Sequence, residues 1–159
     1  MVKKETVLSV VKEIRNHLKS RFPHTPVLKP EAIVSNEGRF VRNSYGTVTD
    51  KQLKLIWYPT MAKQLTWEEA KKECEKLGCR LPTTKELYSL VDVSKYEPAI
   101  DKEIFPDTKS DYYWTSDVCA WDAGYAWYVD FSGGRVGGWY KGDSVYVRAV
   151  RSSQCRENY

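Results

Sequence analysis

The pattern of hydrophobic and polar positions changes twice along the chain. Near the N-terminus, hydrophobic residues recur at intervals of three and four, which predicts an amphipathic helix over residues 5–21. Residues 23–30 include three prolines in eight positions, so this segment predicts an extended connector rather than more helix. Three roles remain open for the helix: packing against its own domain or a sister subunit, oligomerisation, and tethering to another protein.

After this connector the pattern becomes typical of short strands. Residues 39–50 contain a turn between two β-prone runs, and residues 53–58 follow as a strand. Residues 93–111 carry scattered prolines and charges and are expected to be a loop. The last third predicts an antiparallel meander of three strands joined by tight turns, at 125–131, 135–140 and 144–151.

Two helices are predicted between these β regions. Thr66, with Glu69 three residues later, is typical of a capping box, and Gly78 is placed to end that helix. Thr83 or Thr84 is expected to cap the next helix. The elements together predict an α+β fold, with a basic helix and connector at residues 1–30 and one ligand-binding domain at residues 31–159.

Charge and hydropathy exclude some classes of protein. Of the net charge of +4, residues 1–30 carry +5 and the rest of the chain carries −1. A nucleic acid is therefore not expected as the main ligand, because the domain lacks the positive charge that phosphates require. No apolar run approaches a membrane span, and no secretory signal is recognisable. We expect a cytoplasmic protein at synthesis, with display on a cell surface or virion left open.

Aromatic content is high, at 13%, with 6 Trp and 11 Tyr. These two side chains combine a large contact area with a polar group and are enriched in binding surfaces. The alternative is that the rings fill a small β-rich core.

Three blocks of sequence resemble the C-type lectin-like domain at the C-terminus of bacterial collagen-like adhesins. The blocks are Gly46–Asp50 with Trp57, Leu65–Leu90, and Tyr112–Arg151. The variable proteins of diversity-generating retroelements also use this family. The resemblance implies a C-type lectin-like fold with two core helices and a C-terminal antiparallel β-meander.

The cysteines depart from the usual pattern of these relatives. C-type lectins usually link a helix cysteine, matched here by Cys74, to a cysteine in the last strand, where this chain has Ala149. Cys155 could substitute for that partner, or Cys74 could be a buried thiol. Without a signal peptide, reduced thiols are compatible with the sequence. The redox state stays open for Cys74, Cys79, Cys119 and Cys155.

Neither metal chemistry nor catalysis is expected. The calcium-binding motifs of sugar-binding C-type lectins are absent from the sequence, so we expect no calcium, no other metal and no cofactor. The segment 79–87 is similar to formylglycine-generating enzymes, but nothing around Cys119 or Cys155 matches their active-site cysteines. Both histidines, His17 and His24, lie outside the matched domain. A copper-dependent oxidase is the remaining enzyme alternative.

Strand alternation predicts which side chains the meander presents to a ligand. The inward set is Trp127, Val129, Phe131, Val136, Tyr140, Val145, Val147 and Ala149, and Arg148 is expected to point outward. The preceding loop, 116–124, is expected to be exposed beside the outward face. The candidate ligand-binding residues are Asp117, Cys119, Trp121, Asp122, Tyr128, Asp130, Arg135, Trp139 and Tyr146.

The composition of residues 112–147 indicates a function. This stretch contains one Lys and no Glu, Gln, Met or Asn. Retroelement variable proteins diversify at adenines, often in Asn codons, which yields residues such as Tyr, Asp, Ser and Gly. We therefore predict a non-enzymatic variable protein that binds a protein or cell-surface ligand, with possible self-association through the N-terminal helix. The alternative is an invariant adhesin-type module for a glycan or polyanion.

Overall fold

A computed structural model describes residues 33–34 and 38–154. All of them lie in the second of two units, Met1–Glu31 and Ala32–Tyr159, into which the chain divides. The predicted N-terminal helix, the connector and Cys155 lie outside the described residues, and the predicted domain boundary stays a prediction. In the described part of the chain, no helix is long and apolar enough to cross a membrane.

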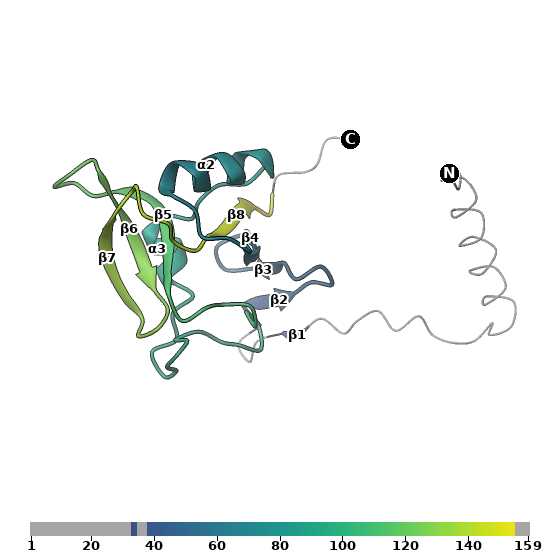
Figure 1. Cartoon of the computed structure of the whole chain (residues 1–159). Helices are drawn as coiled ribbons and strands as arrows, with labels where there is room; N and C mark the ends of the chain where they lie inside the picture. Colours follow the sequence, from purple (N-terminus) through teal and green to yellow (C-terminus); the bar gives the residue numbers. More distant parts are fainter. Residues whose placement is uncertain (1–32, 35–37, 155–159) are drawn as a thin grey trace, which may run out of the picture. The chain divides into compact units, whose positions relative to one another are not determined.

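One sheet contains five antiparallel strands in the order β1-β2-β3-β4-β8. The strands are β1 (Ile33–Val34), β2 (Phe40–Arg42), β3 (Val48–Asp50), β4 (Leu55–Thr60) and β8 (Arg148–Ser152). The turn predicted between β2 and β3 is present, and Gly46 there has a φ of 79°, which glycine adopts readily. Strand β8 returns to β4, with Trp57 opposite Val150, so the first and last strands belong to one sheet and form its two edges (Figure 1).

The second sheet is a three-stranded meander in the order β5-β6-β7. Its strands are β5 (Tyr112–Val118), β6 (Tyr125–Asp130) and β7 (Arg135–Tyr140). Strands β6 and β7 confirm the sequence prediction. The strand predicted at 144–151 is present as β8, but its predicted place in the meander is wrong, because it pairs with β4 instead of β7. Residues 147–150 are all buried, and a strand covered on both sides gives no alternation from which to assign its sheet.

Helices α2 (Trp67–Lys76) and α3 (Thr84–Tyr88) begin at the predicted caps. The backbone N–H and the hydroxyl of Thr66 donate to Glu69 Oε2 at 3.0 and 2.9 Å. Gly78 follows α2 with a φ of 67°. Thr83 caps α3 by accepting the Glu86 N–H at 3.2 Å. Both caps are local in sequence, which is why the pattern alone located them.

The core has two clusters, one on each face of β5 and β6. Leu87 of α3 packs in the cluster that contains Tyr113 and Val129. Trp67 of α2 packs in the cluster that contains Trp114 and Ala126. The fold is thus α+β with antiparallel sheets, and its helices cover the inner part of the β5–β7 sheet.

Candidate functional site

The β5–β7 sheet carries aromatic side chains on both faces. The register places Trp114 opposite Tyr128, and Ala126 opposite Trp139. Because side chains alternate along a strand, these residues share one face with Tyr112, which we name face A. The opposite face, face B, carries Tyr125, Trp127, Val136 and Tyr140.

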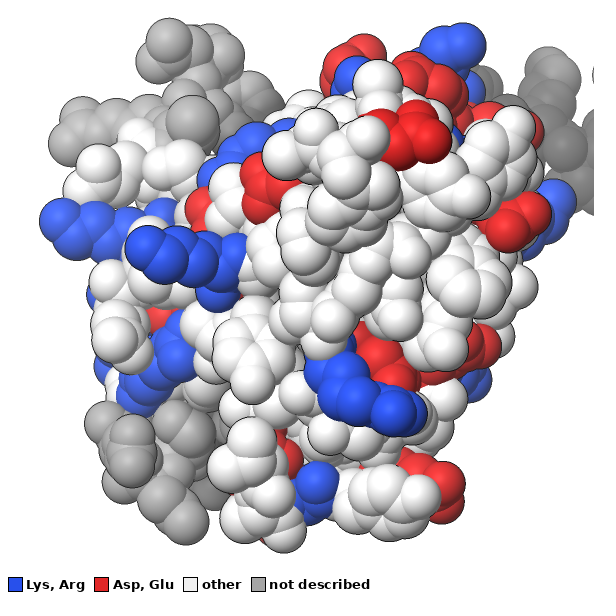
Figure 2. Space-filling view, turned by 90° about the vertical axis from the view of Figure 1, so that its left-hand side faces the viewer, with Lys and Arg blue, Asp and Glu red and all other residues white. Residues whose placement is uncertain are grey.

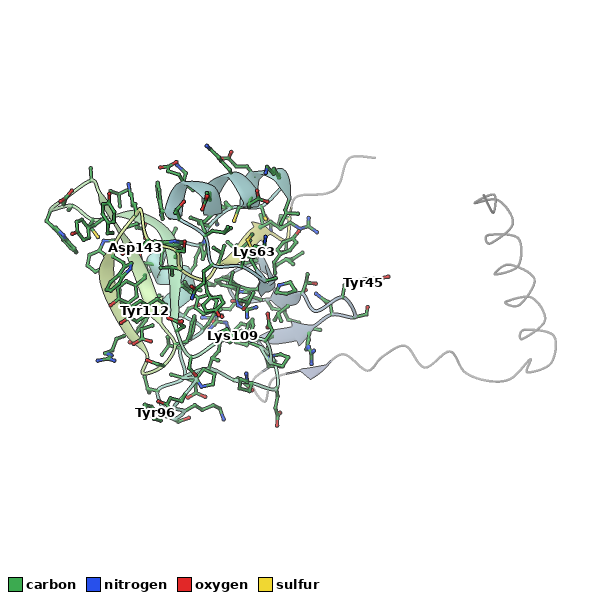
Figure 3. The ribbon with its side chains drawn as sticks, in the orientation of Figure 1. Tyr45, Lys63, Tyr96, Lys109, Tyr112 and Asp143 are labelled. Atoms are coloured by element: carbon green, nitrogen blue, oxygen red, sulfur yellow. The ribbon has the colours of Figure 1, made fainter. Side chains whose placement is uncertain are left out.

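Three rings form a compact group on face A. The rings of Tyr112 and Tyr128 stack with centroids 4.3 Å apart and an interplanar angle of 23°. Trp139 meets both rings edge-on, at 5.3 and 6.1 Å, yet keeps 38% of its surface exposed. Trp114 is buried on the same face, and its indole N–H donates to the Leu65 carbonyl at 2.9 Å. The rings are therefore held in place by neighbours, and Figure 3 shows Tyr112 beside the strands of this sheet.

Face A carries an ion pair between Arg135 and Asp130, of which only the arginine is accessible to solvent. Arg135 donates to Asp130 Oδ2 at 3.3 Å, and its side chain is exposed. Asp130 is 2% exposed and also accepts the N–H and hydroxyl of Ser132, at 2.8 and 2.6 Å. Asp130 lies on the predicted face, but it is buried rather than exposed to a ligand, because its carboxylate closes the turn after β6.

Face B is more exposed than the sequence predicts. Trp121 meets Trp127 edge-on at 5.1 Å, and Tyr125 meets Tyr140 at 5.9 Å. Trp121 is 62% and Tyr140 53% exposed. The prediction that Tyr140 and Val136 point into the core is wrong, and Trp127 is half-buried rather than buried. Helix α3 packs against β5 and β6, so β7 extends beyond its cover.

Two glycines allow rings to lie against β7. A Cβ on Gly137 would come within 2.6 Å of the Tyr128 hydroxyl on face A. A Cβ on Gly138 would come within 2.6 Å of the Trp121 ring and 2.8 Å of Cys119 Sγ on face B. The Gly-Gly pair therefore positions one aromatic ring on each face of the strand.

Three predicted site residues have structural contacts instead. Asp117 accepts the Thr84 N–H at 2.7 Å at the start of α3. Cys119 is buried, and burial raises the pKa of its thiol. Tyr146 is half-buried and stacks on Tyr113, with centroids 5.6 Å apart. Of the predicted set, the exposed or half-buried members near the rings are Trp121, Asp122, Tyr128, Arg135 and Trp139.

Sequence reasoning missed three rings, Tyr112, Tyr125 and Tyr140. Tyr112 could have been found only by placing residues 112–118 in a strand, but that strand is buried at its centre and shows little alternation. Arg148, predicted to point outward, is 1% exposed. It donates to the Tyr58 carbonyl at 2.8 Å and to Asp107 Oδ1 at 3.0 Å.

The surface around the rings is mostly uncharged. Figure 2 shows the side on which β6 and β7 lie as a broad region of uncharged residues, with charged groups chiefly around it. Among the described residues, no group of His, Cys, Asp and Glu is placed to hold a metal ion. Cys74 and Cys79 are buried free thiols, and burial raises the pKa of Cys74 to about 12. The side chains around the rings can interact with a ligand through van der Waals contacts and hydrogen bonds.

Comparison with known proteins gives a family for this domain. Residues 46–151 match the family model described as the Lcl C-terminal domain. The match covers the aromatic sheet and both described helices, and it agrees with the resemblance to the lectin-like domain of bacterial adhesins. A search of the curated proteins found no match.

Proposed function

The chain belongs to the Lcl C-terminal domain family, a lectin-like recognition module, and we propose that this member binds its ligand through the β5–β7 sheet without catalysing a reaction. The observation that carries the proposal is the ring group of face A. Trp139 keeps 38% of its surface exposed while packed against Tyr112 and Tyr128. Rings already fixed by neighbours lose little conformational entropy on binding, which suits a recognition surface.

The finer part of the proposal is a C-type lectin-like scaffold whose surface varies between copies. Two helices between early and late strands, and a last strand that returns to β4, support this arrangement. Tyr125, Tyr140, Asp122 and Asp143 are exposed, and each is a residue type that adenine substitution can generate from an Asn codon. We therefore propose a variable protein of a diversity-generating retroelement.

The gene tests the variable-protein proposal. We expect a near-identical repeat of the codons for residues 112–147 beside the gene, differing at adenines, together with a reverse transcriptase gene. The differing codons should fall on exposed positions such as Tyr125 and Tyr140. A locus with neither the repeat nor a reverse transcriptase gene would contradict diversification. It would not bear on the proposed binding function, which is tested separately.

Binding is tested with three probes: arrayed glycans, heparin in a salt series, and a phage-displayed library of random peptides. We expect binders that wild type retains and Trp139→Ala loses by tenfold or more. Tyr45→Ala is the matched control, because Tyr45 is 92% exposed and lies away from β5–β7 (Figure 3). Steeply salt-dependent heparin binding that is indifferent to Trp139 would instead support the polyanion-binding module. Binders that both variants retain contradict a face A site.

A further inference from the structure

Among the strands that the structure describes, none covers the outer edge of β7. The other side of β5 is covered by Tyr146, which accepts the Trp114 N–H at 3.0 Å and donates to the Tyr112 carbonyl at 3.1 Å. The edge of β8 is covered by Arg80, which exchanges two hydrogen bonds of 2.9 Å with Val150. Within residues 33–34 and 38–154, no strand pairs with the free side of β7. In Figure 1 this strand borders the domain.

The register shows which backbone groups β7 presents. Phe131 donates to the Asp111 carbonyl at 3.1 Å, so alternate β6 residues bond to β5 and the others bond to β7. Lys141 accordingly donates to the Gly124 carbonyl at 2.9 Å. By this alternation, the free side presents the N–H and C=O groups of Val136 and Gly138 and the N–H of Tyr140, whose C=O accepts the Asp143 N–H at 3.1 Å.

Between Val136 and Tyr140, the edge lacks the devices that usually prevent strand pairing. Lysines, prolines and bulges are the common protections of an exposed edge. The six residues of β7 include neither Lys nor Pro, and they pair with β6 in six consecutive positions without a register shift. The β5–β6 pair, by contrast, is interrupted between Trp114 and Val118. The exposed edge is therefore regular.

Aromatic rings flank this edge on both faces. Tyr128 lies against Gly137 on face A, beside Trp139. Trp121 lies against Gly138 on face B, and the exposed Tyr140 follows on the same strand. A strand added to β7 would place alternate side chains against these two groups, the arrangement by which sheet edges recognise extended peptides.

We infer that β7 is a docking edge for an extended peptide segment of a protein partner, added antiparallel to residues 135–141. This inference rests on the proposed recognition function and names its ligand class. Arg135 bonds to Asp130 at 3.3 Å but keeps its side chain exposed, and the Lys141 ammonium lies 4.1 Å from the centroid of the Trp67 ring. The positive charge at both ends of the edge favours acidic residues at the ends of the peptide, with apolar residues between. Self-pairing centred on Gly138 would place Arg135 of one copy opposite Lys141 of the other, and directly opposed like charges destabilise a sheet.

The test uses the capped heptapeptide Asp-Val-Thr-Ile-Tyr-Val-Glu and two N-methylated forms. In antiparallel register, the fourth peptide residue lies opposite Gly138 and donates its N–H to β7, whereas the N–H of the fifth points away. Methylation of the fourth nitrogen should weaken binding tenfold or more, and methylation of the fifth by less than threefold, as measured by calorimetry. Equal binding of the two methylated forms, or no binding of the parent peptide at millimolar concentration, overturns the inference.

A matched pair of protein variants gives a second readout. Val136→Pro removes an outward N–H while leaving the β6 hydrogen bonds, since proline is tolerated where a strand's N–H faces solvent. Val136→Thr retains that N–H and is the control. We expect the proline variant to lose the peptide and the threonine variant to keep it, with unchanged circular dichroism in both. If the proline variant does not fold, the methylated peptides decide alone.

The two proposals can fail separately. If the peptides show no backbone dependence while Trp139→Ala still loses binders from the library or the glycan array, the edge inference falls and the recognition function stands. If the peptide binds with backbone dependence but no binder depends on Trp139, the face A proposal falls. Sedimentation that shows dimers lost in Val136→Pro would assign the edge to self-pairing and contradict a peptide partner.

Discussion

Buried charge in this domain is held by contacts between distant parts of the chain. Arg148 donates to the Tyr58 carbonyl, 90 residues away, and to Asp107, 41 residues away. Burial alone would raise the pKa of Asp107, but the Arg148 guanidinium and the Thr60 N–H outweigh it and hold that pKa below its ordinary value. Strand alternation predicted that Arg148 points to solvent, because alternation within one strand gives no information on partners that are distant in the sequence.

Removal of the Asp107 carboxylate should show how much the ion pair between Arg148 and Asp107 contributes to the free energy of unfolding. In Asp107→Ala the guanidinium of Arg148, 1% exposed, loses its ion partner. Because the Asp107 side chain is 37% exposed, solvent screening lowers the expected cost below that of a fully buried pair, to about 1–2 kcal/mol. Asp143→Ala is the control, since Asp143 is exposed, and it should change stability by no more than about 0.5 kcal/mol. Urea unfolding of both variants and wild type measures the difference. Equal stabilities would show that the pair contributes nothing.

At the scale of single elements, what is local in sequence was predictable. Both helix caps lie within four residues of sequence and were found from the pattern. Strand β5 was missed, because Tyr113, Trp114 and Thr115 are consecutive and all buried, so alternation is absent. The partner of β8 was also assigned wrongly, because sheet membership depends on pairing between residues about 90 positions apart.

The stability of helix α3 should depend strongly on its N-terminal cap, because the helix is short. It has five residues, and Thr83 and Glu86 bond reciprocally, with Arg80 donating twice to the Glu86 carboxylate at 2.8 Å. Thr83→Ala should cost about 1 kcal/mol in the free energy of unfolding. Lys85→Ala, on the exposed side of the same helix, should cost less than about 0.5 kcal/mol. Indistinguishable variants in urea titrations would contradict a stabilising cap.

At the scale of the whole molecule, the helices decide which rings are core and which are surface. Strand alternation assigned face A correctly for Tyr128, Arg135 and Trp139, since it orders residues within a strand. It failed for Val136 and Tyr140, because periodicity does not report how far α3 extends over face B. The exposure of the aromatic residues on face B could therefore be recognised only from the three-dimensional structure.

Acid should destabilise the domain through its partnered carboxylates. Burial alone would raise the pKa of Asp50 and of Glu86, but hydrogen bonds and the charges of Arg39 and Arg80 lower both, as Arg148 does for Asp107. A lowered folded-state pKa gives stability that is fully present above the unfolded-state pKa and is lost as pH falls through the folded-state pKa.

We therefore expect unfolding free energy to be level from pH 7 to about 5 and to fall below about pH 4. Urea titrations across this range measure the change. The Asp107→Ala variant should lose less stability on acidification than wild type, because one of the linked carboxylates is gone. Wild-type stability unchanged down to about pH 2 would contradict the linkage.

The most direct measurement of ligand recognition by the β5–β7 sheet is chemical-shift mapping on ¹⁵N-labelled protein titrated with a binder recovered from the peptide library or the glycan array. We expect the largest amide shifts within residues 112–118 and 125–140, including the indole N–H of Trp139, with the amides of β2 and β3 unmoved. Shifts concentrated on the five-stranded sheet, with the Trp139 signal unchanged, would contradict the proposed site.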